Sequence, residues 1–137
     1  MGERRGGEVT LRWRSGMVFE GGPPGRPVVA VDAQSVTAIS PVELLLLAAA
    51  ACTAADVVSI MQKQRVDVRS LDVGVQGTRR DEEPRRFTAL HFLFTLSGAG
   101  ADEPRARRAI DLSLEKYCSV VASLASDIRI TYELALR

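Results

Sequence analysis

A long apolar segment in the middle of the chain places the strongest constraint on its fold. Residues 42–58 contain only three polar side chains, at Glu43, Thr53 and Asp56. Ser40 is a favourable helix N-cap, Pro41 suits the first helical position, and Glu43 completes a capping box three residues after Ser40. The uninterrupted apolar run is shorter than the roughly 20 residues that a bilayer requires. We therefore predict a core helix, buried on nearly every side, and not a membrane span.

Strand patterns flank this helix on both sides. Apolar and polar residues alternate, or β-branched residues cluster, in six segments, at residues 9–14, 17–20, 28–31, 66–75, 87–96 and 128–136. The first segment has one apolar and one charged face and should be half buried, and the fifth is apolar on both faces, which is typical of a central strand. The alternation slips at Arg69–Ser70, which indicates an irregularity. The charged residues 79–86 are expected to form a solvated hairpin loop.

A second helix is predicted to begin near residues 102–104 and to continue to about Leu124, with a candidate break near Cys118. The fold class is therefore α+β. With 137 residues, the chain has room for a single domain over residues 1–137, with residues 1–8 as a flexible tail. A sheet of about six strands and one further helix can cover only part of a helix that is apolar all round. We therefore predict that a second copy completes the core in a homodimer.

Composition removes several classes of function. The net charge of +1 gives no global field that would attract nucleic acid or an anionic membrane. His91 is the single histidine, so the usual zinc sites and a Ser-His-Asp or Cys-His catalytic pair are hard to build. Residues 1–8 do not resemble a secretory signal, which favours the cytoplasm.

The remaining chemistry lies in two cysteines, Cys52 on the apolar helix and Cys118 late in the second helix. Each could be a buried packing residue, because free cysteine is among the most buried residue types. Alternatively they form a thiol pair, in which one thiolate attacks an electrophile and the other resolves the product as a disulfide. A thiolate at Cys52 needs a nearby cation, since the helix dipole fades within the first turn. Glu43 lies nine positions from Cys52, on the opposite side of a straight helix, and is better explained as a capping residue.

Four sequence segments together resemble the OsmC/Ohr family, and its YhfA-like branch in particular. They run over residues 40–44, 52–58, 79–92 and 111–120, and the resemblance extends from about residue 9 to the end of the chain. It implies an OsmC-like fold, in which an intertwined homodimer wraps sheets around two central helices and places its active sites between the subunits.

The resemblance also implies an activity. Cys52 corresponds to the peroxidatic cysteine and Cys118 to the resolving cysteine of enzymes that reduce organic hydroperoxides with electrons from a dithiol, without a metal or an organic cofactor. The glutamate that precedes the reactive cysteine by ten residues in those enzymes is replaced here by Val42. The arginine of those enzymes has no match at its usual position in this sequence. Arg12, Arg14 or Arg26 are the candidates to take its place. The alternative is a non-catalytic protein that binds a small hydrophobic ligand in the dimer cleft.

Overall fold

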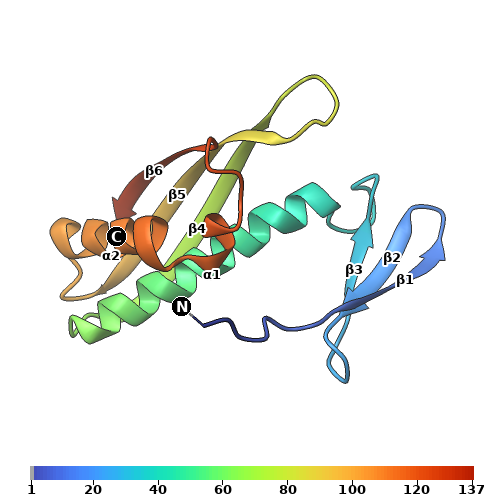
Figure 1. Ribbon diagram of the computed structural model, residues 1–137. Coiled ribbons are helices and arrows are strands. Elements are labelled where there is room, and N and C mark those ends of the chain that lie inside the picture. Colours follow the sequence, from blue (N-terminus) through green and yellow to red (C-terminus); the bar gives the residue numbers. More distant parts are fainter. Residues whose placement is uncertain (1) are drawn as a thin grey trace. The chain divides into compact units, whose positions relative to one another are not determined.

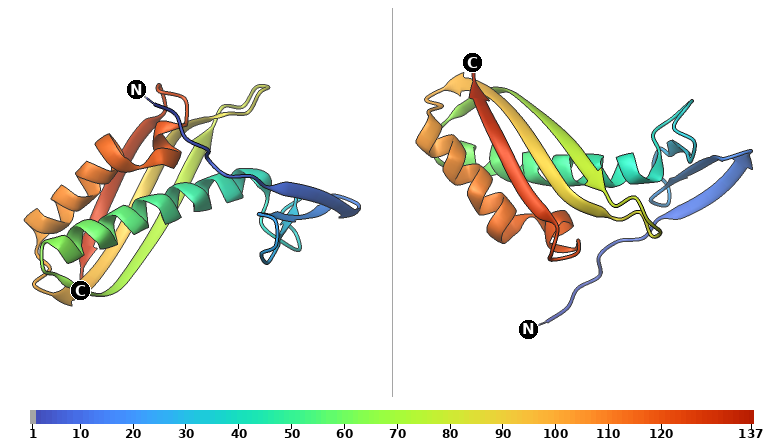
Figure 2. Two further views of the ribbon diagram at one scale, coloured as in Figure 1. Left: turned by 60° about the horizontal axis from the view of Figure 1, so that its bottom comes forward. Right: turned by 90° about the horizontal axis from the view of Figure 1, so that it is seen from above.

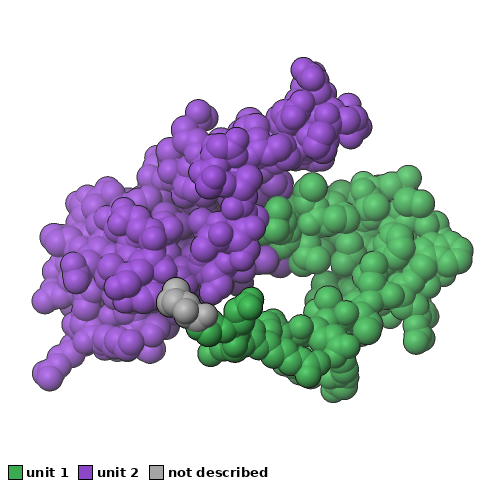
Figure 3. Space-filling view, in the orientation of Figure 1, with its two compact units in different colours: residues 1–45 green, residues 46–137 purple. Residues whose placement is uncertain are grey.

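The computed structural model describes residues 2–137 and divides into two compact units, residues 1–45 and residues 46–137 (Figure 3). Met1, part of the predicted tail, lies outside the described residues, and residues 2–9 belong to no helix or strand. The prediction of one domain over the whole chain remains a prediction.

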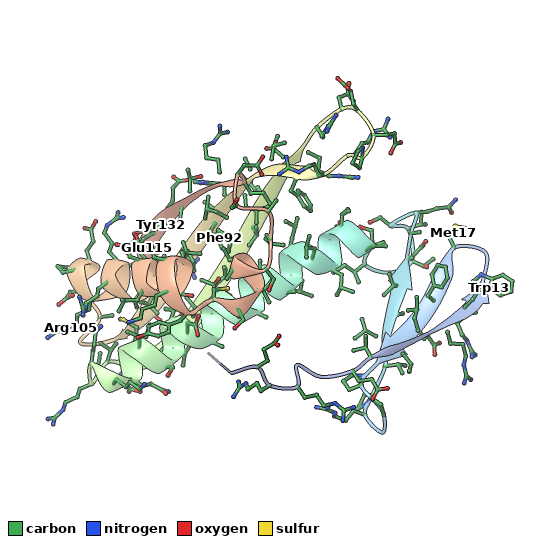
Figure 4. The ribbon with its side chains drawn as sticks, viewed as in Figure 1. Trp13, Met17, Phe92, Arg105, Glu115 and Tyr132 are labelled. Atoms are coloured by element: carbon green, nitrogen blue, oxygen red, sulfur yellow. The ribbon has the colours of Figure 1, made fainter. Side chains whose placement is uncertain are left out.

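The first unit contains a three-stranded antiparallel sheet. Its strands are β1 (Thr10–Ser15), β2 (Val18–Gly22) and β3 (Val29–Asp32), in the order β1-β2-β3. The expectation that the first strand is half buried is wrong for the single chain, because Leu11 and Trp13 are each 64% exposed. Figure 4 shows Trp13 and Met17 at the turn end of this hairpin. The apolar face of β1 therefore has no cover within the described part of its own unit.

Asp32 organises the irregular segment that follows β3. Its Oδ1 accepts a hydrogen bond from the Gln34 backbone N–H at 2.9 Å, and its Oδ2 accepts from the backbone N–H groups of Val36 and Thr37 and from the Thr37 hydroxyl. These hydrogen bonds, those from the backbone of Thr37 and Gln34 most of all, lower the pKa of the Asp32 carboxyl to about 2. The carboxylate thus fixes the turn that leads into the long helix.

The long helix, α1 (Pro41–Lys63), begins at the predicted capping box. The Ser40 N–H donates to Glu43 Oε1 at 3.0 Å, and the Glu43 N–H donates to Ser40 Oγ at 3.2 Å. The Ser35 hydroxyl donates to the same carboxylate, so hydrogen bonds from Ser35 and Ser40 lower the pKa of Glu43. The interpretation of Glu43 as a capping residue is confirmed.

The single chain covers one face of α1, so burial of this helix on nearly every side remains a prediction for the homodimer. The buried side chains follow helical spacing along one face, and they are Ala49, Ala50, Thr53, Val57 and Met61. Leu45 and Leu47 are 38% and 54% exposed, because the chain's own sheet lies on one side of the helix only. By length and composition α1 could cross a membrane, but a core helix of a water-soluble protein passes the same test.

The second unit packs two helical segments against one face of a sheet (Figures 1 and 2). The sheet has the order β4-β5-β6, with β4 (Asp67–Arg79) antiparallel and β6 (Arg129–Leu136) parallel to the central β5 (Phe87–Ala99). The predicted central position of β5 and the irregularity near Ser70 are confirmed. The core is built from alternate β5 side chains, all at most 2% exposed, at Leu90, Phe92, Phe94 and Leu96. The charged loop at 80–86 connects β4 to β5 and is mostly exposed, as predicted.

The second helical region is broken where the sequence indicated. It consists of α2 (Glu103–Leu112), a π-helical turn η1 (Ser113–Tyr117) and the short α3 (Ser119–Ala122), with Cys118 between the last two. The expectation of one sheet of about six strands is corrected, since the six strands form two sheets of three.

Candidate functional site

The two cysteines meet inside the second unit. The Sγ atoms of Cys52 and Cys118 and a carboxylate oxygen of Asp56 all lie within 4.8 Å of one another. Both cysteines are free thiols; Cys52 is partly exposed and Cys118 is buried. The 65 intervening residues thus fold back to bring the predicted thiol pair together.

The helix geometry of α1 places Cys52 and Asp56 side by side. They are four residues apart, which puts their side chains on the same face about one turn apart. Asp56 is fixed by Ser113, whose hydroxyl donates to Asp56 Oδ2 at 2.8 Å across the gap to η1. Because Ser113 is fully buried, this hydrogen bond joins α1 to the second helical region at the site.

Cys118 occupies the N-cap of α3 instead of a helix interior. Its sulfur accepts hydrogen bonds from the Val121 backbone N–H and from the hydroxyl of the buried Thr53, each at 3.4 Å. Burial raises the pKa of the Cys118 thiol; the hydrogen bonds from Thr53 and Val121 act in the opposite direction, and the neighbouring Cys52 adds to the rise. Cys118 therefore favours the protonated form in the structure.

A cavity of about 490 Å³ adjoins the pair and includes Asp56 in its wall. Its remaining lining combines apolar, polar and cationic side chains from α1, the turn that follows it, α2 and η1, namely Ser59, Ile60, Lys63, Gln64, Arg108, Leu112 and Tyr117. Asp56 belongs both to the cavity wall and to the thiol cluster, so a molecule in the cavity lies close to the two cysteines.

The other residues considered at the sequence level belong to the first unit, whereas both thiols belong to the second. Val42 lies in the first turn of α1. Arg12, Arg14 and Arg26 all belong to the first unit, where Arg14 lies 3.6 Å from Glu20. Their assignment as activating cations remains a prediction.

Sequence reasoning missed Asp56 and Ser113 as members of the site. One signal for Asp56 was available: Cys52 and Asp56 share a four-residue spacing on an otherwise apolar helix. Ser113 carried no such signal, because its contact with Asp56 joins residues 57 positions apart. The contact depends on the π-helical turn that begins at Ser113.

This arrangement, a long helix against a three-stranded sheet with two thiols facing each other, defines a class of small α+β proteins with a paired-cysteine centre. Residues 33–133 match the OsmC-like protein family, and the chain belongs to that family. Protein YhfA from Escherichia coli K12 is 39% identical over 126 residues, which cover 91% of this chain and 94% of YhfA. The predicted family resemblance is confirmed.

Solved structures share the fold. The OsmC-like protein of Mycoplasma pneumoniae superposes with a TM-score of 0.84 at 15% identity, over 98% of this chain and 99% of that chain. The organic hydroperoxide resistance protein OhrB of Bacillus subtilis superposes with a TM-score of 0.61 at 17% identity, over 97% and 98% of the two chains. The α+β, OsmC-like fold class is therefore established for this chain.

Proposed function

We propose that the protein reduces organic hydroperoxides, with Cys52 as the attacking thiol and Cys118 as the resolving thiol. The observation that carries the proposal is the cluster in which both sulfurs lie within 4.8 Å of each other and of Asp56. The roles follow from accessibility: Cys52 is partly exposed, whereas Cys118 is only 3% exposed and its pKa is raised by burial. A nucleophile must reach its substrate as a thiolate, which favours Cys52 for the first step.

The proposed cycle has three steps. The Cys52 thiolate attacks the O–O bond, so that an S–O bond forms, the peroxide bond breaks, and the departing alkoxide takes up a proton and leaves as an alcohol. The Cys118 sulfur then displaces water from the Cys52 sulfenic acid to form a disulfide. A dithiol reductant returns both thiols by exchange and is itself oxidised. The cavity beside Asp56 has a volume in the range of small-molecule sites and offers room for the organic part of the substrate.

The working protein is proposed to be a homodimer. The exposed Leu45 and Leu47 on α1 and the exposed Leu11 and Trp13 on β1 are apolar surfaces that a second copy would cover. In such a dimer, one of Arg12, Arg14 or Arg26, from either protomer, supplies the cation for the Cys52 thiolate. We place the protein in the cytoplasm, where a reducing environment maintains free thiols.

The test is peroxide turnover with a dithiol reductant and a panel of organic hydroperoxides. Wild-type protein is expected to consume peroxide and to lose two thiols per chain when the reductant is omitted. Cys52→Ser should be inactive, and Cys118→Ser should accumulate a sulfenic acid that a dimedone probe traps at Cys52. Gln62→Ala, at an exposed position on the same helix that belongs neither to the thiol cluster nor to the cavity wall, is the matched control and should retain wild-type turnover.

Equal and slow peroxide consumption by wild type and Cys52→Ser would refute the proposal. If both thiols also resist mild oxidants, and native mass spectrometry of the purified protein finds a small apolar molecule bound, the non-catalytic ligand-binding function replaces it.

A further inference from the structure

We propose that Cys52, Asp56 and Cys118 form a binding site for one thiophilic divalent cation, with Zn²⁺ as the leading candidate. The site needs the two thiols and the carboxylate but no peroxide chemistry, so metal binding can be tested independently of the proposed hydroperoxide reduction. It also needs no histidine, which is the ligand type that the composition makes scarce.

The three donor atoms already have nearly the required spacing. A tetrahedral zinc ion with Zn–S bonds of about 2.3 Å holds two sulfurs about 3.8 Å apart. The donor atoms of Cys52, Asp56 and Cys118 lie within 4.8 Å of one another, so closure onto an ion requires a movement of at most about 1 Å. A disulfide, with an S–S bond of about 2.05 Å, requires a much larger approach of the same two sulfurs.

Hydrogen-bond donors around the cluster are arranged as they are around metal ligands. The Ser113 hydroxyl donates to Asp56 Oδ2 at 2.8 Å. The Thr53 hydroxyl and the Val121 N–H both donate to Cys118 Sγ. Such outer donors orient metal ligands and stabilise their anionic forms, and their loss typically lowers metal affinity by about 10- to 100-fold. Two of the three ligands are therefore held in place from outside the site.

The chemistry of the donors selects the kind of ion. Deprotonation of both thiols places three negative charges within 4.8 Å of one another, and a divalent cation between them offsets the resulting repulsion. Thiolates favour Zn²⁺ and Cd²⁺ over Mg²⁺ and Ca²⁺, which prefer oxygen ligands. Binding forms two metal–sulfur bonds and one metal–oxygen bond and releases the thiol protons to solvent. Water is left for the fourth position, and no atom changes oxidation state.

The site exists only in the reduced protein, because a Cys52–Cys118 disulfide removes both sulfur ligands. Zn²⁺ and peroxide would then compete for the same two thiols. A saturating ion is expected to protect the thiols from oxidation, and oxidation to the disulfide is expected to abolish metal binding.

The experiment titrates the reduced, metal-free, full-length chain with Zn²⁺ against a chromophoric chelator, and with Cd²⁺ while thiolate-to-metal charge-transfer absorption is followed. One ion per chain is expected. X-ray absorption of the zinc form should show two sulfurs at about 2.3 Å and oxygen ligands at about 2.0–2.2 Å. A zinc coordination sphere with fewer than two sulfurs would overturn the proposal.

Four variants separate ligands from bystanders. Cys52→Ser and Asp56→Asn should each weaken Zn²⁺ binding at least tenfold, and Ser113→Ala should weaken it by about 10- to 100-fold while all three ligands remain. The matched control is Asp72→Asn, an exposed aspartate on β4, which should bind as wild type does. Wild-type affinity in Cys52→Ser or in Asp56→Asn would refute the three-ligand site.

Cys118 is buried, so its role as a metal ligand is tested without a substitution, in the wild-type protein. Saturating Zn²⁺ should slow alkylation of both Cys52 and Cys118 by N-ethylmaleimide, as counted by mass spectrometry. Unchanged alkylation of either cysteine would contradict the site.

Discussion

The exposed leucines of α1 give the sharpest test of the proposed homodimer. Leu47 is 54% exposed in the single chain although it lies on the most apolar helix of the protein. Complete burial of a leucine side chain contributes about 1.5–3 kcal/mol, so covering the remaining half contributes about 0.75–1.5 kcal/mol. In a twofold-symmetric dimer the contact occurs twice, which brings the sum to about 1.5–3 kcal/mol per dimer.

Leu47→Ala is therefore expected to raise the dimer dissociation constant by roughly 10- to 150-fold. Analytical ultracentrifugation over a dilution series of wild type and variant measures this directly. The matched control is Val36→Ala, at a position that is 78% exposed but lies outside α1, and it should leave the dissociation constant unchanged. A wild-type chain that stays monomeric at every concentration, or a dimer that Leu47→Ala leaves unaffected, would refute the reasoning.

Three further predictions concern the fold. Met61→Ala removes a fully buried side chain from the covered face of α1 and should lower the free energy of unfolding by about 2–5 kcal/mol in a urea titration. A loss below about 1 kcal/mol would show that this side chain is packed more loosely than described. Gly77→Ala places a Cβ 2.4 Å from the Phe87 ring, so it should cost about 1–3 kcal/mol in the same assay, whereas Gly74→Ala, where the nearest atom is 3.8 Å away, should cost less. Asp32→Ala should lower the free energy of unfolding at neutral pH, and its difference from wild type should shrink as the pH falls from about 4 towards 2. The pKa of the Asp32 carboxyl rises from about 2 to its ordinary value on unfolding, so the carboxylate stabilises the fold above about pH 4, and protonation removes this effect. A gap that does not change with pH would contradict that assignment.

Much of the fold was predictable because local signals agreed with the final structure. The capping box at Ser40 and Glu43 is a contact between residues three apart, so it can be recognised without tertiary information. The strands likewise show their period of two in the sequence, and the break before α3 falls at Cys118 as predicted. The sequence could not say how much of this burial the single chain provides, however. An apolar side chain indicates that a surface needs cover, but not whether the chain's own sheet or another molecule supplies it.

The candidate site was likewise predictable from the sequence only in part. The sequence by itself determined which residues could carry chemistry: Cys52 on a capped apolar helix, Cys118 near a helix break, and a composition with a single histidine. Only the tertiary structure decided that Asp56 and Ser113 belong beside the two thiols, and that Cys118 is buried at a cap with two hydrogen-bond donors on its sulfur. The reason is physical. Helix and strand periodicity depend on neighbours a few residues apart, whereas the distance between two sulfurs depends on how the whole sheet and its helices pack.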